Sequence, residues 1–148
     1  MLNLPTITTE QRRALMRVLA RTDGARIRQQ IAALGALPAY EVIRRPQIGL
    51  AMLRGRVAGS GAPFNLGEAS VTRAAVRLDG GELGVSYALG RDADKALDCA
   101  VLDALIQRVE WRERVSEQVL APLDSALVAR DEVEAAKAHD PIAKLLAE

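Results

Sequence analysis

The side chains that most often perform catalysis or bind metals are scarce in this sequence. Its 148 residues include one cysteine, Cys99, and one histidine, His139. A protein metal site usually needs three or four ligands, and these two residues are far apart in the sequence. Cys99 belongs to the apolar stripe of a helical segment, so we expect a buried thiol rather than a nucleophile, and we expect His139 to be exposed. We predict no catalytic residue and no metal site, and a single cysteine excludes an internal disulfide.

The stretch from Gly55 to Glu68 is a candidate for binding an anion through its backbone. Its glycines include Gly59, Gly61 and Gly67, whose conformational freedom would let several N–H groups point at one phosphate. No Gly-Lys-Ser/Thr follows, as in a P-loop, and a strand rather than a helix is expected next, which excludes a dinucleotide-binding turn. The alternative is a long hairpin connection whose glycines adopt positive φ angles. Phe64 would then anchor either its own core or a neighbouring molecule.

Five arginines accompany this stretch: Arg54, Arg56, Arg73, Arg77 and Arg91. Arg54 and Arg56 share one face of a strand, and pairing with the next strand would bring Arg54 close to Arg73. Like charges that face each other across strands are unfavourable by up to about 1 kcal/mol. A phosphate or a carboxylate between them would offset this repulsion, and Glu68 is the nearest carboxylate in the sequence. We treat these side chains as candidate contacts for an anion or a partner, the alternative being ordinary surface arginines.

The net charge of +1 conceals an uneven distribution along the chain. Residues 1–39 carry a net charge of +4, residues 40–91 carry +3, and residues 92–148 carry −6. The basic part raises the question of RNA binding, but four aromatic residues provide few stacking platforms, so we expect no nucleic-acid partner. The carboxylates of the last segment are expected to line solvated helix faces.

The same three segments differ in their hydrophobic periodicity, within a single domain that covers residues 1–148. Residues 1–39 predict two helices and residues 92–148 predict further helices. Residues 40–91 predict a mostly antiparallel sheet of about four strands, at 40–44, 48–57, 70–78 and 83–89. The expected fold class is therefore α+β.

Local signals mark where the helices begin and break. Thr8 and Gln11 fit a capping box at the start of the first helix. Asp92 is a suitable N-cap for the helix that follows the sheet. Pro122 suits the first turn of a helix better than its interior, so it predicts a break in the C-terminal segment.

Alternation assigns the faces of the last two strands if Leu78 and Leu83 close the hairpin between them. One face would then form the core: Thr72, Ala74, Val76, Leu78, Leu83, Val85, Tyr87 and Leu89. The other face would place Arg73 and Arg77 beside a row of small residues: Gly84, Ser86 and Ala88. This pattern predicts a shallow, positively charged surface that is covered by a partner or by water.

Neither the interior nor the start of the sequence suggests a membrane or export segment. No apolar run approaches the ~20 residues of a spanning helix. A signal peptide requires a charged n-region followed by a long apolar run, and residues 1–5 and the residues after them show neither. We therefore expect a cytoplasmic protein without a membrane partner.

An ordered series of short motifs runs from residue 40 to residue 107. The motifs are Tyr40-Glu41-Val42-Ile43-Arg44, Gly49-Leu50, Arg56, Gly59-x-Gly61, Gly67-Glu68, Thr72 to Leu78, Gly84, Gly90-Arg91-Asp92 and Asp103-Ala104-Leu105. The series resembles the PhnG family, the small G subunits of the bacterial carbon–phosphorus lyase system. The sequence departs from that family at Lys95-Ala96-Leu97, where a His-Ala-Glu run is usual, at Leu15, where a tryptophan is usual, and at residues 140–146, which lack an aromatic-rich tail.

The resemblance implies one subunit of a larger enzyme. In that system a core complex of G, H, I and J subunits, with an ATPase-like L subunit, supports the attack of a phosphonate on the ribose C1′ of ATP. Adenine leaves and α-D-ribose 1-methylphosphonate 5-triphosphate forms, in the catabolism of organic phosphonates. The resemblance assigns nucleosidase chemistry to the I subunit and radical iron–sulfur chemistry to the J subunit.

For this chain the resemblance implies a non-catalytic structural partner. It would bind no cofactor alone, ATP being a substrate of the complex. We expect such a subunit to expose apolar surface, so that the isolated chain self-associates or binds the homologue of the I subunit. The alternative is a catalytic subunit that binds ATP or phosphonate directly through Arg56, Arg73 and the loop from Gly59 to Gly67.

Overall fold

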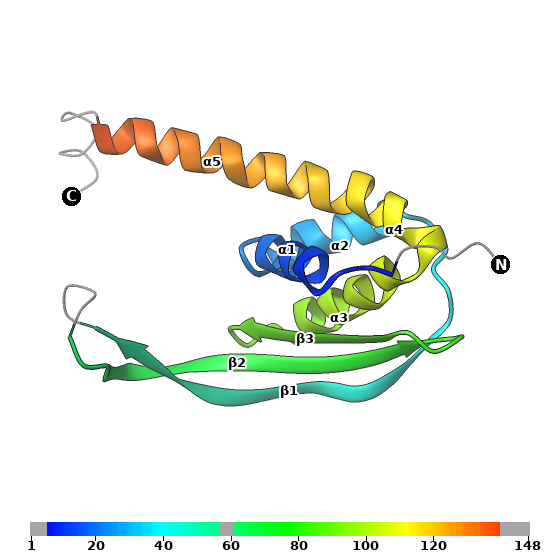
Figure 1. Cartoon of the computed structure of the whole chain (residues 1–148), viewed down its shortest axis with the longest axis horizontal. Helices are drawn as coiled ribbons and strands as arrows, with labels where there is room; N and C mark the ends of the chain where they lie inside the picture. Colours follow the sequence, from blue (N-terminus) through cyan, green and yellow to red (C-terminus); the bar gives the residue numbers. More distant parts are fainter. Residues whose placement is uncertain (1–5, 57–60, 140–148) are drawn as a thin grey trace.

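The computed structural model describes residues 6–56 and 61–139. The elements in chain order are α1 (Thr9–Ala20), α2 (Gly24–Ala33), β1 (Tyr40–Gly55), β2 (Phe64–Leu78), β3 (Leu83–Leu89), α3 (Ala93–Gln107), α4 (Val109–Val115), η2 (Ser116–Leu120) and α5 (Ala121–His139). Figure 1 shows the sheet as one layer, α3 against one of its faces, and α1, α2 and α5 on the far side of α3. The α+β class predicted from the sequence is confirmed.

The described sheet has three strands, so the prediction of four is wrong. Its strands are antiparallel and lie in the order β1-β2-β3. The two strands expected at 40–44 and 48–57 are one strand, β1, which continues through Pro46 and pairs irregularly with β2 on both sides of Arg44. Because β1 is at the sheet edge, Pro46 can lack an N–H group there, and the irregularities accommodate it. The predicted strand end at Val57 lies outside the described residues.

The second strand begins earlier than expected, so part of the predicted loop belongs to the sheet. Phe64 pairs with Gly55, and Gly67 pairs with Leu53 after a register shift. Gly67 has φ of +149°, a conformation that favours glycine at this bulge. Gly61 lies in a bend before β2, and Gly59 lies outside the described residues.

The hairpin between β2 and β3 closes one residue earlier than predicted, and this reverses the faces of β3. The N–H of Leu78 donates to the carbonyl of Glu82 at 2.9 Å, and Arg77, not Leu78, pairs with Leu83. Because side chains alternate along a strand, a shift of one residue moves every side chain of β3 to the other face. The residues of β3 that face the helices are Gly84, Ser86 and Ala88, and those that face away are Leu83, Val85, Tyr87 and Leu89.

Small residues on β3 allow α3 to pack very closely on the sheet. A Cβ atom built on Gly84 would lie 2.0 Å from the carbonyl oxygen of Ala100 and 2.6 Å from the nitrogen of Ala104. The hydroxyl of Ser86 donates to the carbonyl of Ala96 at 2.6 Å. The row of small residues was predicted to border a shallow surface, but it is instead the part of the sheet on which α3 packs.

A buried ion pair joins α1, α3 and β3. Asp103 on α3 is 2% exposed and accepts hydrogen bonds from Arg12 Nε at 3.0 Å, from Arg12 Nη2 at 2.7 Å and from the backbone N–H of Val85 at 2.9 Å. One turn later, Gln107 donates to the carbonyl of Leu83 at 2.7 Å. Asp103 and Gln107 thus form hydrogen bonds with two backbone groups in the first half of the free edge of β3, the N–H of Val85 and the carbonyl of Leu83.

The predicted N-caps of α1 and α3 are confirmed, whereas the break predicted at Pro122 is not. Thr8 accepts from the N–H of Gln11 at 3.1 Å, and Gln11 accepts from the N–H of Thr8 at 2.9 Å, which completes the capping box. Asp92 caps α3 by accepting from the N–H of Lys95 at 3.0 Å. Pro122 lies in the continuous helical stretch of α4, η2 and α5, directly after the π-helical turn η2, and the residues that flank this turn, Val115 and Ala121, are both helical, so the chain does not break there.

Candidate interaction surface

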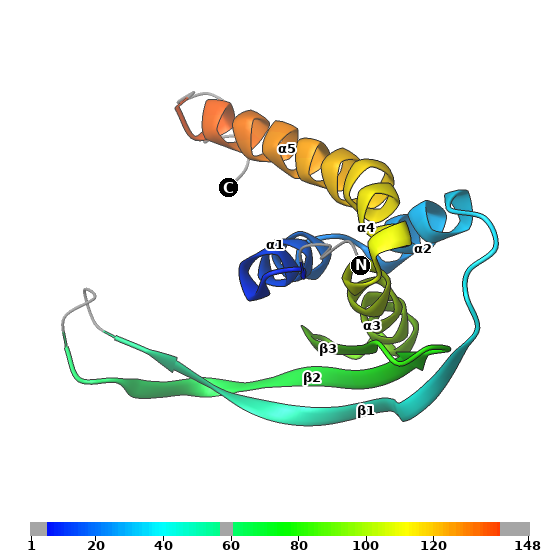
Figure 2. The same cartoon turned by 45° about the vertical axis from the view of Figure 1, so that its right-hand side comes forward.

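The face of the sheet turned away from α3, here called the open face, carries exposed apolar side chains. On β3 these side chains are 40–68% exposed: Leu83, Val85, Tyr87 and Leu89. Figure 2 shows the labelled helices on the opposite side of the sheet. Domains normally bury the apolar face of a sheet against a second layer, and large exposed apolar patches mark interaction sites. The open face is therefore the candidate functional site.

Two of the predicted contact residues, Arg73 and Arg77, lie on this open face. In the register of the sheet, Arg73 lies between Gln47 of β1 and Tyr87 of β3. Arg77 lies next to Leu83 in the same way. Their neighbours on β3 are thus aromatic and aliphatic side chains rather than the small residues predicted. Among the described residues, neither arginine forms an ion pair.

A hollow of about 570 Å³ opens next to Arg73. It is lined by Gln47, Ile48, Gly49, Leu50, Val71, Arg73 and Tyr87. The space beside Gly49 is open, because a Cβ atom on this residue would meet nothing within 4 Å. Val71, the partner of Gly49 across the strands, is 3% exposed and closes the hollow from below. The sequence analysis used Gly49 only as part of a family motif, and a glycine between large residues of a strand was the available signal.

The structure does not bring Arg54 or Glu68 to this group. Arg54 pairs with Asn65, seven residues along β1 from the position opposite Arg73, which is roughly 20 Å on an extended strand. The expected approach of Arg54 to Arg73 is therefore wrong. Glu68 has its side chain on the face toward the helices, so it does not lie between the arginines.

The other predicted contacts lie at the ends of strands. Arg56 directly follows β1, and Arg91 follows β3 after Gly90. Phe64 begins β2 and is exposed, so it does not anchor the core of its own chain. These residues remain candidate contacts, but they belong to two places: Arg56 and Phe64 lie at the same end of the β1–β2 pair, where Gly55 pairs with Phe64, and Arg91 lies after β3.

Beyond the end of β3, β1 and β2 continue as a two-stranded arm formed by residues 50–55 and 64–70 (Figure 1). Its face toward the helical side carries the exposed apolar residues Leu50 and Met52, and Ile48 continues this row into the three-stranded part of the sheet. A two-stranded ribbon is at best marginally stable by itself. The arm is therefore a second surface that contact with another molecule would stabilise.

Two groups that could in principle take part in catalysis, the Cys99 thiol and the Asp98 carboxyl, are largely shielded from water. Burial raises the pKa of the Cys99 thiol to about 12, so the prediction of a buried, neutral thiol is confirmed. Desolvation raises the pKa of the Asp98 carboxyl, although Arg28 lies 3.2 Å away. In the described ranges, no three His, Cys, Asp or Glu side chains gather as metal ligands would. The side chain of His139 lies outside the described residues.

Comparison with known proteins identifies the family. The sequence matches the model of the family described as phosphonate metabolism protein PhnG over residues 10–141. The chain belongs to the PhnG family. A PhnG relative from Rhizobium meliloti (strain 1021), named alpha-D-ribose 1-methylphosphonate 5-triphosphate synthase subunit PhnG, is 44% identical over 118 residues, which are 78% of this chain and 76% of the relative. The resemblance inferred from the motifs is thereby confirmed, and the family match includes the whole open face.

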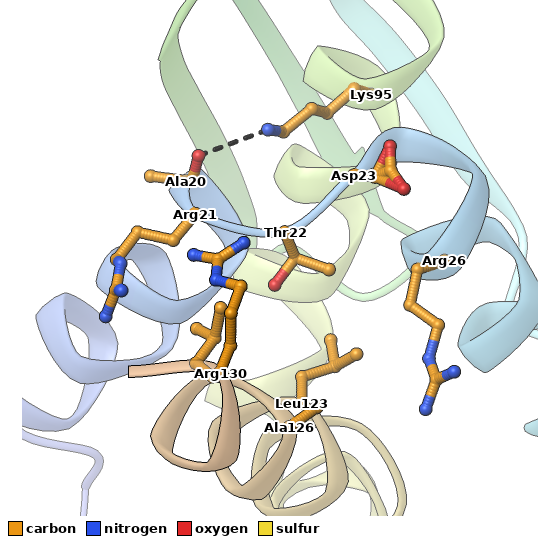
Figure 3. A pocket seen from close by; sticks show the side chains of 10 residues that line it. Ala20, Arg21, Thr22, Asp23, Arg26, Lys95, Leu123, Ala126 and Arg130 are labelled. Carbon is orange, nitrogen blue, oxygen red and sulfur yellow. Dashed lines mark hydrogen bonds between the residues drawn. The ribbon is translucent and has the colours of Figure 1, made fainter. Parts of the chain in front are cut away.

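One departure from the PhnG pattern, Lys95, lines a cavity of about 590 Å³ in the helical layer, between the α1–α2 connection, the start of α3 and α5 (Figure 3). Two basic side chains that line the cavity already have partners within the chain: Lys95 donates to the carbonyl of Ala20 at 3.2 Å, and Arg21 pairs with Asp131 at 2.7 Å. The pairing lowers the pKa of the Asp131 carboxyl. Arg130 points toward Thr22 within the cavity. Mixed charges and internal partners make this cavity a weaker candidate than the open face.

The described helices include none with both the length and the apolar character needed to cross a bilayer.

Proposed function

We propose that this chain is a non-catalytic subunit of an α-D-ribose 1-methylphosphonate 5-triphosphate synthase. The complex would contain homologues of the H, I and J subunits, act with the L subunit, and function in the cytoplasm in phosphonate catabolism. In its reaction a phosphonate attacks the ribose C1′ of ATP and adenine leaves. The name of the Rhizobium relative supports membership of such a synthase. ATP is a substrate of the complex, and the chain alone binds no cofactor.

The uncovered open face is the observation that carries the structural role. Four apolar side chains of β3 are exposed to solvent in the isolated chain, although the other face of the same strand is buried under α3. Burying apolar surface contributes roughly 25 cal/mol for each Å² removed from water. A second subunit that covers this face supplies the missing layer of the fold, which makes docking its primary role.

Direct binding of ATP by Arg56, Arg73 and the loop from Gly59 to Gly67 has less support. The position opposite Arg73 is nine residues from Arg56 along β1, roughly 30 Å on an extended strand. One bound triphosphate would not contact both arginines in this arrangement. Arg56 and Arg73, the two arginines of that alternative site, thus belong to separate parts of the surface.

Co-expression with the other synthase subunits tests the proposal. We expect Leu89→Asp to reduce recovery of the complex at least tenfold in size-exclusion chromatography, because a carboxylate buried in an apolar interface loses its hydration. Val133→Asp on α5 is the matched control, since Val133 is also an exposed apolar residue but lies far from the open face. A complex that assembles normally with Leu89→Asp would refute docking through the open face.

A further inference from the structure

The open face combines apolar side chains with an excess of positive charge. Arg44, Arg73 and Arg77 belong to this face, and Glu41 is the carboxylate that the described structure places among them. Glu41 lies opposite Arg77, and Arg44 lies opposite Ala75, so neither is the cross-strand neighbour of Arg73. Arg73 therefore has Gln47 and Tyr87 as its cross-strand neighbours, and no carboxylate of the described residues lies beside it in the register of the sheet.

We propose that another subunit of the synthase inserts an aspartate or glutamate side chain into the hollow at Gly49, where its carboxylate pairs with Arg73. This inference rests on the proposed function, because it needs the open face to be a subunit interface. It adds the chemistry of the partner: an apolar contact surface with a carboxylate at its centre.

Desolvation is the first reason for a carboxylate. When a partner covers the open face, Arg73 leaves water, and a buried charge without a counter-charge is strongly unfavourable. The chain itself offers no carboxylate next to Arg73 among its described residues. The partner must therefore supply the acceptor, and a carboxylate accepts two parallel hydrogen bonds from a guanidinium.

The polar lining of the hollow is the second reason. Arg44 Nη1 donates to the side-chain oxygen of Gln47 at 3.2 Å, which leaves the NH₂ group of Gln47 to donate elsewhere. Gln47 and Arg73 are cross-strand neighbours, so both can donate to one acceptor in the hollow. Gly49 and Val71 provide an apolar base for the methylene stem, and Tyr87 provides an aromatic wall.

The spacing of the arginines favours a carboxylate over a phosphate. Arg73 and Arg77 are four residues apart on one strand, about 13 Å, so they do not share one small anion. One guanidinium and one amide match the needs of a singly charged carboxylate. Arg77 has Glu41 opposite it on β1, so Arg73 is the arginine that requires an acidic residue of the partner.

Filling the hollow is the sharpest test, because the substitution fits the isolated chain. Gly49→Leu meets nothing within 4 Å at its Cβ atom, so we expect an unchanged circular dichroism spectrum and thermal midpoint. The same variant should weaken assembly of the co-expressed complex at least tenfold. Wild-type affinity of Gly49→Leu for the other subunits would overturn the inference.

A second experiment identifies the acid. Arg73→Lys places an amine at the same position, and a water-soluble carbodiimide joins an amine to a carboxylate in direct contact. In the assembled complex we expect mass spectrometry to find this amine linked to an Asp or Glu of another subunit. Arg26→Lys on α2, also exposed, is the control and should give no such link. A link only within the chain, or none in a fully assembled complex, would overturn the inference.

The two proposals fail in different ways. If Leu89→Asp prevents assembly while Gly49→Leu and Arg73→Lys give wild-type affinity and no link, docking through the open face stands and the carboxylate is refuted. If none of the three substitutions affects assembly, both proposals are refuted.

Discussion

Asp103 is a charged residue within the hydrophobic core, and the hydrogen bonds it accepts compensate for its burial. Arg12 donates to both of its oxygens, and this contact raises the pKa of Arg12. Removing one partner of a buried ion pair costs about 3–5 kcal/mol. The side chain of Arg12 is 34% exposed, so water screens part of this interaction and a smaller loss is expected.

We predict that Arg12→Met lowers the free energy of unfolding by about 2–3 kcal/mol, because the carboxylate of Asp103 keeps its burial and loses its counter-charge. Urea unfolding followed by circular dichroism measures the change. Arg21→Met is the matched control: the Arg21–Asp131 pair has the same 2.7 Å separation but lies in solvent, so little change is expected. Equal losses for the two variants would show that burial does not decide the strength of the pair.

The sequence could not reveal this role of Asp103. We assigned the acidic residues of the last segment to solvated helix faces, but Asp98 is largely buried and Asp103 is buried. Its partner Arg12 is 91 positions away, and the Val85 N–H that it also binds belongs to a strand edge. Contacts of this kind depend on the packing of three elements, which no local pattern specifies.

At the level of elements, signals confined to one helix predicted the structure well. The capping box at Thr8 and the N-cap at Asp92 depend on residues three positions apart, and both are confirmed. The sheet was harder to predict because its register depends on the turn between strands. The earlier closure of the hairpin places small residues under α3, and periodicity alone could not detect that α3 needs this close approach.

Gly84 tests this close approach between β3 and α3. We predict that Gly84→Ala destabilises the chain by at least about 1–3 kcal/mol, because the added Cβ atom clashes with backbone atoms of α3, which cannot rotate away as a side chain can. Thermal unfolding of the isolated chain measures the loss. Gly49→Ala is the control on the other face, where the Cβ atom meets open space, so its midpoint should be unchanged or slightly higher. An unchanged midpoint for Gly84→Ala would contradict the packing described.

At the scale of the whole molecule, the core is concentrated around α3, and three parts of the molecule lie outside it: the second half of α5, the arm and the open face. Residues 96 and 99–106 of α3 are buried, whereas residues 128–138 of α5 are exposed at every position. The arm extends past the end of β3, and the open face has no second layer (Figure 1). Local stability follows the density of buried contacts. The isolated chain should therefore combine a stable centre with weakly protected extensions.

Hydrogen exchange should show this gradient and locate the docking surface. The bonds from Leu78 N–H to Glu82 and from Gly90 N–H to Ser70 imply that odd-numbered N–H groups of β3 point to its free edge. Asp103 binds the N–H of Val85, but the N–H groups of Tyr87 and Leu89 have no such side-chain acceptor among the described hydrogen bonds. We predict slow exchange in α3 with or without partners, and at least tenfold slower exchange in peptides covering 83–89 once the complex forms. A partner on the open face would exclude water from β3 and its free edge. Protection that appears in α5 and not in β3 would therefore place the docking surface on the helical side.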